Sequence, residues 1–260
     1  PGFPTYEAIT SLAGAHPVCY PMSADDSFRF SVGALEKLIT KKTRAVVINS
    51  PSNPTGHIIP DSELKGLATL ADAHDLMVIS DEVYREFYYG KRCPSFLDVS
   101  GRGLVVNSLS KTEAMTGWRI GWTVGPPEFI SAITAVNQHS VTCAPTLSQR
   151  VALRALGASA EERAAGTRAD FSQRRRLILE MIDDQLGLPR IEPEGAFFVL
   201  LEAAPSGDSL GLALDILDKT NVITIPGAAF GEESSRFLRL SFGATEACIF
   251  EGLRRLGGYF

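Results

Sequence analysis

The chain has 260 residues, of which 45% are hydrophobic and 21% charged, with 23 glycines and 15 prolines. This usage is ordinary for a globular protein and excludes collagen, a coiled coil and bulk disorder. Because 30 acidic residues outnumber 25 basic ones, the formal net charge is −5, and no global positive field favours nucleic acid as a partner.

The cysteines give no sign of metal binding or disulfide bonding. Four of them lie far apart without a CxxC pair: Cys19, Cys93, Cys143 and Cys248. That spacing favours neither a zinc site nor a disulfide framework. There is no 18-residue apolar run, and the start carries no basic segment leading into an apolar core. We therefore expect a cytoplasmic protein that holds no metal and does not contact a membrane.

Apolar, β-branched runs alternate with segments of helical period in the first half of the chain. Strands are expected at residues 16–21, 44–49, 76–80, 104–107 and 119–124. Residues 61–75, between the second and third of these, have one apolar face at helical spacing. This order predicts an α/β fold with a mostly parallel central sheet and flanking helices.

The second half begins with helical periodicity and then becomes mixed. Helices are expected at 127–140, 145–156, 159–186, 210–219 and 245–256, and strands at 195–201, 222–225 and 237–241. The helix at 159–186 is long enough to link two bodies. We expect a large domain over residues 1–160, and an interdomain helix with a smaller C-terminal α+β domain over residues 161–260.

Polar clusters directly follow three of the expected strands. The stretch SPSNPTG follows the strand at 44–49, DEVY the strand at 76–80 and SLSK the strand at 104–107. If these strands are parallel, the clusters lie on one rim, where open α/β sheets bind ligands. The connection from Lys111 to Arg119 is too short for a crossover helix. We therefore expect an antiparallel strand that begins on the same rim.

These clusters supply an amine, a carboxylate, a phenol, an amide, two hydroxyls and a guanidinium. The residues are Lys111, Asp81, Tyr84, Asn53, Ser108, Ser110 and Arg119. A lysine at such a rim is either a structural ion-pair partner or a nucleophilic amine. Its neighbours match what a phosphorylated aromatic aldehyde held as a Schiff base would need.

The chain resembles the class I and II aminotransferases, pyridoxal-phosphate enzymes of fold type I, in five consecutive motifs. They are SNPTG (52–56), SDEVY (80–84), NSLSK (107–111), MTGWRIGW (115–122) and RLSFG (239–243). The motifs occur in the family's order, and the resemblance extends from the first residue to the last. In the family, the opening PGFPTY stands well inside the large domain. The resemblance thus implies that an N-terminal portion is absent here.

The resemblance implies a role for each cofactor residue. Lys111 would carry pyridoxal 5′-phosphate as a Schiff base and move a proton between the substrate and the cofactor. Asp81 would face the pyridine nitrogen, and Tyr84 and Asn53 would bind the 3′ oxygen. Ser108 and Arg119 would bind the phosphate.

The resemblance also implies a stacking residue and a substrate site. Phe3 would stack over the cofactor ring. Arg239 would bind the α-carboxylate of the substrate through a bidentate pair, with Asn53 beside it. The Asn53–Pro54 bond is expected to be cis. We expect Ser110 to be structural, Glu82 to be structural or solvated, and His16, His57, His74 and His139 to be packing or surface residues.

The implied activity is exchange of an amino group between an α-amino acid and a 2-oxo acid, in a chain that forms a homodimer at full length. The motifs leave the reaction type open, because carbon–sulfur β-lyases and aminocyclopropane carboxylate synthases share the same residues. A non-catalytic, aminotransferase-like ligand-binding module and an inactive truncated chain are the further alternatives.

Overall fold

The computed structural model covers residues 1–260, and the chain divides into two compact units. The parallel-sheet unit comprises Ser31–Pro51 and Ile58–Arg168, and the antiparallel-sheet unit comprises Pro1–Phe30, Ser52–His57 and Ala169–Phe260. The expected domains, 1–160 and 161–260, stay a prediction. None of the helices carries an apolar stretch long enough to span a bilayer.

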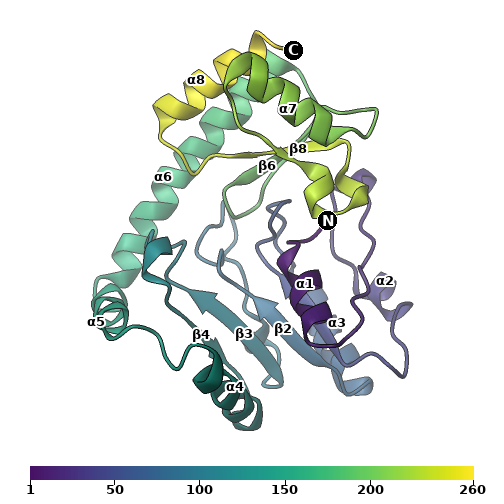
Figure 1. Ribbon diagram of the computed structural model, residues 1–260, viewed down its shortest axis with the longest axis vertical. Helices are drawn as coiled ribbons and strands as arrows, with labels where there is room; N and C mark the ends of the chain where they lie inside the picture. The colour runs from purple at the N-terminus through teal and green to yellow at the C-terminus, as the bar shows by residue number, and fades with distance from the viewer. The chain divides into compact units, whose positions relative to one another are not determined.

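The parallel-sheet unit is built on four strands in the order β1-β2-β3-β4. They are β1 (Ala45–Asn49), β2 (Met77–Asp81), β3 (Gly103–Ser108) and β4 (Gly121–Val124). The first three are parallel and β4 is antiparallel, and Figure 1 shows β2, β3 and β4 side by side. The four strands expected at 44–49, 76–80, 104–107 and 119–124 are thus confirmed to within two residues at each end, as is the antiparallel direction of the last.

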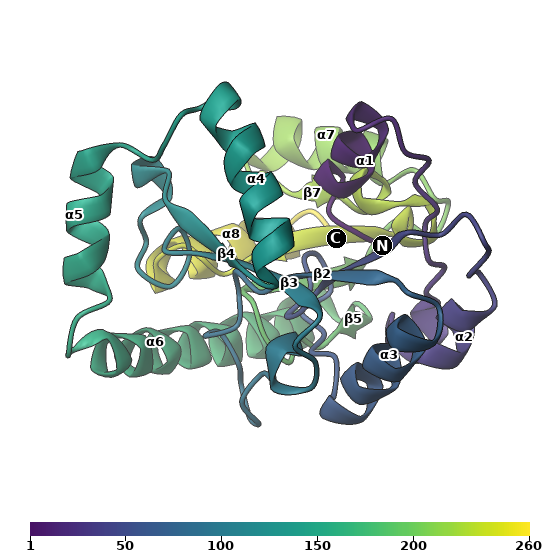
Figure 2. The same ribbon diagram turned by 90° about the horizontal axis from the view of Figure 1, so that it is seen from below.

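Helices follow or precede these strands in the same unit. They are α2 (Val32–Glu36), α3 (Asp61–Ala73), α4 (Pro127–Ser140), α5 (Thr146–Ala155) and the first part of α6 (Ala160–Met181), with 3₁₀ turns η2 (Phe96–Asp98) and η3 (Thr116–Trp118). Helix α3 buries Leu64, Leu67 and Leu70 on one face. The carboxylates of its first turn stabilise the helix by interacting with the positive N-terminal end of its dipole. It lies on the other side of the sheet from α4 (Figure 2).

The antiparallel-sheet unit has four strands in the order β5-β6-β8-β7. The strands are β5 (Arg190–Ile191), β6 (Phe198–Glu202), β7 (Ile225–Pro226) and β8 (Phe237–Ser241). The helices are α1 (Thr5–Leu12), the rest of α6, α7 (Ser209–Thr220) and α8 (Glu246–Gly257), with the π-helical turn η4 (Ile182–Leu186) and the 3₁₀ turns η1 (Ala24–Asp26), η5 (Gly227–Phe230) and η6 (Glu232–Ser234).

The core of the antiparallel-sheet unit joins its N-terminal segment to its sheet. Phe28 packs with Leu200 of β6 and Phe237 of β8. The Phe28 and Phe237 rings meet edge to face, with centroids 5.4 Å apart. Each of these three residues is at most 1% exposed, so the N-terminal segment is held by packing.

Three expectations about elements need correction. No strand forms at residues 16–21, where Val18 is 66% exposed, because a segment with strand propensity becomes a strand only where it pairs with another strand. The strand expected at 222–225 is reduced to the two residues of β7. The short helices α1 and α2 were not predicted. Helix α1 is only eight residues long and buries no residue, and so short a segment holds too few helical turns for its period to be recognised.

Candidate active site

The rim of the parallel sheet is formed by the carboxyl ends of β1, β2 and β3 and the beginning of β4. In the register, Asn49 lies opposite Asp81, and Ser108 lies opposite Gly121. The Asp81 carbonyl accepts hydrogen bonds from Asn49 Nδ2 at 3.0 Å and from Ser50 N at 3.1 Å. Its carboxylate accepts one from Val83 N at 3.2 Å. Asn49 and Ser50 therefore fix the Asp81 backbone at this rim, and the turn that follows holds its half-buried side chain.

Glu82, which follows the last residue of β2, has a structural role in holding the neighbouring turn. Its side chain is buried, and Oε1 accepts hydrogen bonds from Ser80 Oγ, Ser95 Oγ and Phe96 N at 3.1, 2.9 and 2.9 Å. Burial raises the pKa of Glu82, and the hydrogen bonds oppose that rise. The carboxyl thereby ties the 3₁₀ turn at Ser95 to the end of β2, in line with the structural role expected for it.

The lysine and the phenol lie together. The Lys111 Nζ atom is 5.7 Å from the centroid of the Tyr84 ring, within the range of a cation–π contact. Tyr84 is 5% exposed and Lys111 is half-buried. An amine from the loop after β3 thus meets a buried phenol from the loop after β2, as the rim argument predicted.

The loop that carries Lys111 is anchored on both sides. Leu109 and Met115 are buried in one cluster with Ala152 of α5, and Met115 N donates to Leu109 O at 3.2 Å. Farther along, Ser148 Oγ donates to Trp118 O at 2.7 Å. Packing against α5 therefore fixes the connection between β3 and β4, and with it the position of the lysine backbone.

Ser108 and Arg119 lie at the two ends of that connection. Ser108 Oγ accepts from Ser110 N at 3.2 Å, so the hydroxyl caps its own turn and Ser110 serves through its backbone. Arg119 is exposed, has a φ of +50° just before β4, and donates from Nη1 to Thr116 O at 3.0 Å. A Cβ at Gly121 would lie 2.7 Å from Asn107 O, so only glycine lets β4 come this close to the end of β3.

A second group of predicted residues lies within the antiparallel-sheet unit. Arg239 Nη1 donates to Asn53 Oδ1 at 2.7 Å. The guanidinium carbon of Arg239 lies 4.3 Å from the centroid of the Phe198 ring and 4.9 Å from that of Phe230. Two aromatic faces and an amide oxygen therefore orient Arg239, which is only half-buried. A guanidinium held in this way is suited to bidentate binding of a carboxylate.

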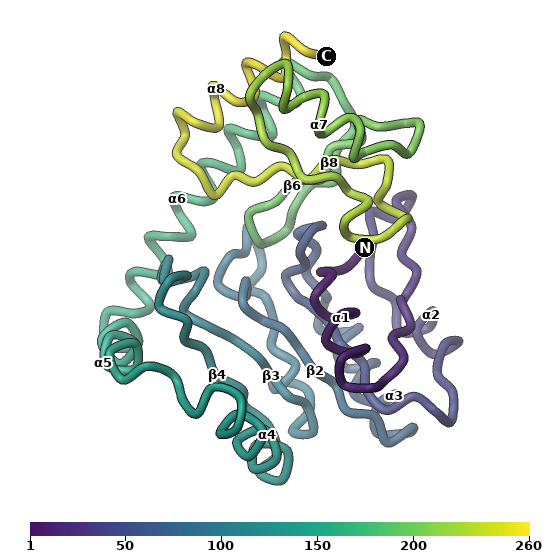
Figure 3. Tube along the Cα trace, viewed as in Figure 1, coloured from purple at the N-terminus to yellow at the C-terminus, as the bar shows by residue number.

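Asn53 and Phe3 also belong to the antiparallel-sheet unit, but Asn53 is buried and Phe3 is exposed. Asn53 is 6% exposed, and the Asn53–Pro54 peptide bond is cis. Phe3 is 39% exposed and contacts Tyr6 edge to face at 5.9 Å. Gly2 N donates to Phe230 O at 2.8 Å, and Figure 3 shows the N-terminus beside the η5 segment. The structure thus ties down the start of the chain, while the stacking role of Phe3 stays a prediction.

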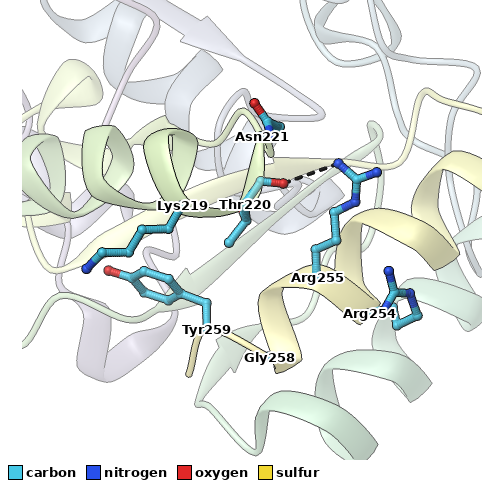
Figure 4. A pocket seen from close by; sticks show the side chains of 7 residues that line it. All are labelled: Lys219, Thr220, Asn221, Arg254, Arg255, Gly258 and Tyr259. Carbon is cyan, nitrogen blue, oxygen red and sulfur yellow. Dashed lines mark hydrogen bonds between the residues drawn. The ribbon is translucent and has the colours of Figure 1, made fainter.

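A surface groove of about 820 Å³ lies at the ends of α7 and α8 and contains none of the predicted residues (Figure 4). It is lined by Lys219, Thr220, Asn221, Arg254, Arg255, Gly258 and Tyr259. Its cations are already paired, Lys219 with Asp215 at 2.8 Å, and both arginines with Glu251 at 2.8 Å. Because the two arginines share the single carboxylate of Glu251, the three cations of the groove face two carboxylates, and most of its positive charge is already matched.

Some residues that shape the two groups carried no signal in the sequence. Phe198 and Phe230 contact the Arg239 guanidinium through their ring faces. In the sequence, neither can be told apart from an ordinary core aromatic residue. His57 is buried against Glu194, with Nδ1 2.9 Å from Oε2. The packing role expected for His57 is consistent with its burial. Its carboxylate partner, 137 residues away in the sequence, could not be read from spacing.

Comparison with known proteins identifies the family. A family model described as aminotransferase class I and II matches residues 1–256. An aromatic-amino-acid aminotransferase of Thermococcus litoralis is 34% identical over 98% of this chain and 67% of its own length. An arginine–pyruvate transaminase of Pseudomonas aeruginosa is 36% identical over 98% of this chain and 66% of its own length. The chain thus spans about two thirds of the length of these relatives.

Solved structures agree. An aromatic aminotransferase from Pyrococcus horikoshii matches with a TM-score of 0.94 and 34% identity, over all of this chain and 71% of that one. A double mutant of the aspartate aminotransferase from Thermus thermophilus matches with a TM-score of 0.93 and 32% identity, over all of this chain and 68% of that one. The chain therefore belongs to the class I and II aminotransferases, a family of pyridoxal-phosphate-dependent transaminases.

Proposed function

We propose that this chain exchanges an amino group between an α-amino acid and a 2-oxo acid, with Lys111 as the residue that holds the cofactor. The observation that carries the proposal is the half-buried Lys111 amine beside the Tyr84 ring, at 5.7 Å from its centroid. Family membership supports the reaction class, since the relatives are named aminotransferases.

The residues of the parallel-sheet rim fit pyridoxal phosphate by their chemistry. An amine, a phenol and a carboxylate come from the ends of neighbouring strands, and a hydroxyl and a guanidinium flank the connection that carries the amine. When bound, the cofactor supplies an electron sink that stabilises negative charge at the substrate α-carbon. Lys111 Nζ would take the proton from that carbon and pass it to the cofactor in the first half of the reaction, and it would move a proton in the opposite direction, to the α-carbon of the second reactant, in the second half.

The neighbouring side chains would tune this chemistry. Asp81, held at the end of β2 by Asn49 and Ser50, would keep a proton on the ring nitrogen of the cofactor through its negative charge. The Tyr84 hydroxyl would donate to the 3′ oxygen. Ser108 and Arg119 would bind the phosphate, the guanidinium through two N–H groups at once.

The substrate would be bound by a different set of residues. Arg239, whose guanidinium contacts Phe198, Phe230 and Asn53, would bind the α-carboxylate through a bidentate pair. Asn53 would orient that guanidinium and contribute to cofactor binding. Phe3 would stack on the cofactor ring. A homodimeric assembly and a cytoplasmic location are proposed on the family resemblance and the sequence alone.

The test begins with the cofactor. Pyridoxal phosphate added to the chain should produce the visible absorbance band of a lysine-bound cofactor, and Lys111→Ala should abolish it. Lys65→Ala is the matched control, because Lys65 is an exposed lysine paired with Asp61 on α3. A band that survives in Lys111→Ala would show that another amine holds the cofactor, and no band in the parent chain would refute the proposal.

The reaction is then tested with a panel of amino acids, each with and without a 2-oxo acid acceptor. Transamination requires the acceptor, and it yields a new amino acid in the amount in which the donor is consumed. A β-lyase would release its product without any acceptor. Acceptor-independent turnover would therefore replace the proposed reaction by another on the same scaffold.

A further inference from the structure

The turn that carries Asn53 is fastened to the segment before β6. The carbonyl of Gly56 accepts hydrogen bonds from Glu194 N at 3.0 Å and from Gly195 N at 2.8 Å. Within the turn, Gly56 N donates to Ser52 O at 2.9 Å. The turn and the segment at Glu194, both in the antiparallel-sheet unit, therefore share backbone hydrogen bonds.

His57 adds a side-chain contact to this junction. Its side chain is buried, and Nδ1 lies 2.9 Å from Glu194 Oε2, while Arg29 Nη2 lies 3.1 Å from Glu194 Oε1. The His57 Nε2 atom is buried without a hydrogen-bond partner. The polar contact of this buried ring thus runs through Nδ1 to Glu194. A buried imidazole is costly unless such a bond compensates it.

The same segment leads directly to the support of Arg239. After Glu194 and Gly195, the fully buried Ala196 has a φ of +56°, and two residues later Phe198 begins β6. The Phe198 ring lies under the Arg239 guanidinium at 4.3 Å. The contact of His57 with Glu194 therefore joins the turn that presents Asn53 to the strand that presents Phe198.

We infer that His57 is a positioning residue for carboxylate binding: through Glu194 it holds Asn53 and Phe198, two of the three groups that orient Arg239. This inference rests on the proposed role of Arg239 as the carboxylate ligand. Misplacing a bidentate arginine weakens binding even when every side chain that touches the substrate is present. Loss of the His57 contact should therefore act on substrate affinity far more than on the rate of the chemical step.

The experiment compares two replacements of similar polarity. In His57→Asn the amide nitrogen takes the place of Nδ1 and can donate to Glu194, whereas in His57→Gln the amide lies farther out, near the place of Nε2. His57→Ala removes the donor altogether. His74→Ala is the matched control, because His74 is an exposed histidine at the end of α3.

Two measurements are made on the full chain with pyridoxal phosphate. The first is KM and kcat for the amino acid that the parent chain uses fastest. The second is the dissociation constant of propionate, a carboxylate without an amino group, measured by calorimetry, which needs no turnover. Urea unfolding of each variant shows that it is folded.

We expect His57→Gln and His57→Ala to raise KM and the propionate dissociation constant about tenfold, with kcat changed less than about threefold, since tenfold corresponds to about 1.4 kcal/mol, a typical hydrogen-bond contribution. His57→Asn should restore both constants to within about threefold of the parent, and His74→Ala should change neither. If His57→Ala does not fold, the comparison of Asn with Gln decides alone.

Two outcomes overturn the inference. The first is that Asn and Gln behave alike, or that all variants match the parent, which would leave His57 a packing residue. The second is a fall in kcat with KM and propionate binding unchanged. A parent chain with neither an absorbance band nor turnover refutes the proposed function and the inference together. A parent chain that is active leaves the comparison of variants as a test of His57 alone.

Discussion

Replacing Gly56 by alanine should destabilise the chain strongly, because two independent constraints meet at this residue. Its φ is +71°, where an L-residue is strained. A Cβ there would lie 2.4 Å from Pro193 Cβ, 2.8 Å from Gly195 O and 2.9 Å from Pro193 Cα. Two of these atoms are backbone, and Pro193 O accepts a hydrogen bond from Arg175 Nε at 2.8 Å, so the surroundings cannot yield by a rotation of one side chain.

The magnitude follows from these two constraints and a matched control. The left-handed conformation costs an alanine about 1 to 2 kcal/mol, reduced by about 0.4 to 1 kcal/mol because alanine also restricts the unfolded chain. The steric conflict adds about 1 to 3 kcal/mol. Gly14 has a φ of +76° with nothing within 4 Å of an added Cβ. Gly14→Ala should therefore cost about 1 kcal/mol and Gly56→Ala about 3 kcal/mol.

The assay is urea unfolding followed by far-ultraviolet circular dichroism, with the free energy of unfolding extrapolated to zero urea. The difference between the two variants, about 2 kcal/mol, measures the conflict with Pro193 and Gly195. Equal losses in the two variants, within about 0.5 kcal/mol, would refute the reasoning, because only the backbone constraint would then be acting.

Two further predictions concern buried ionisable groups. The pKa of Glu82 is raised above its ordinary 4.5 by burial, so its contribution to stability is present below about pH 4.5 and is lost as the pH rises through the folded-state pKa. Glu82→Gln should therefore lose less unfolding free energy than the parent between about pH 4.5 and 8, measured by urea unfolding at several pH values, and an identical pH dependence would contradict this. Cys93 is 0% exposed, and this burial raises the pKa of its thiol to about 12. A thiol reagent should then label the exposed Cys19, Cys143 and Cys248 in the folded chain and reach Cys93 only in urea. Early labelling of Cys93, detected by peptide mass spectrometry, would show that its site opens.

Much of the parallel-sheet unit could be predicted because its signals are local. The spacing of apolar residues over a few turns of chain predicts strands and helices. The short connection from Lys111 to Arg119 predicted the antiparallel direction of β4, which the structure shows. Parallel strands bring their carboxyl ends to one edge. The meeting of Lys111 with Tyr84 thus followed from strand order, before any contact was known.

The same local signals failed where pairing was decided elsewhere. The segment at residues 16–21 has strand propensity but pairs with no other strand, and it remains irregular. Strand propensity describes how well side chains fit a half-buried pleated surface. It cannot state whether such a surface is present.

Contacts between distant residues were decided only by the tertiary structure. Asn53 and Arg239 are 186 positions apart, and Arg239 Nη1 donates to Asn53 Oδ1 at 2.7 Å. The RLSFG motif indicated the arginine but not Phe198 and Phe230, the aromatic rings that it contacts. The burial of Cys93, the triple hydrogen bonding of Glu82 and the pairing of His57 with Glu194 likewise depend on which segments pack together. A sequence gives the order and chemistry of its side chains, whereas burial and distance depend on the path of the whole chain. The reactive groups could therefore be predicted from the sequence, but their positioning could not.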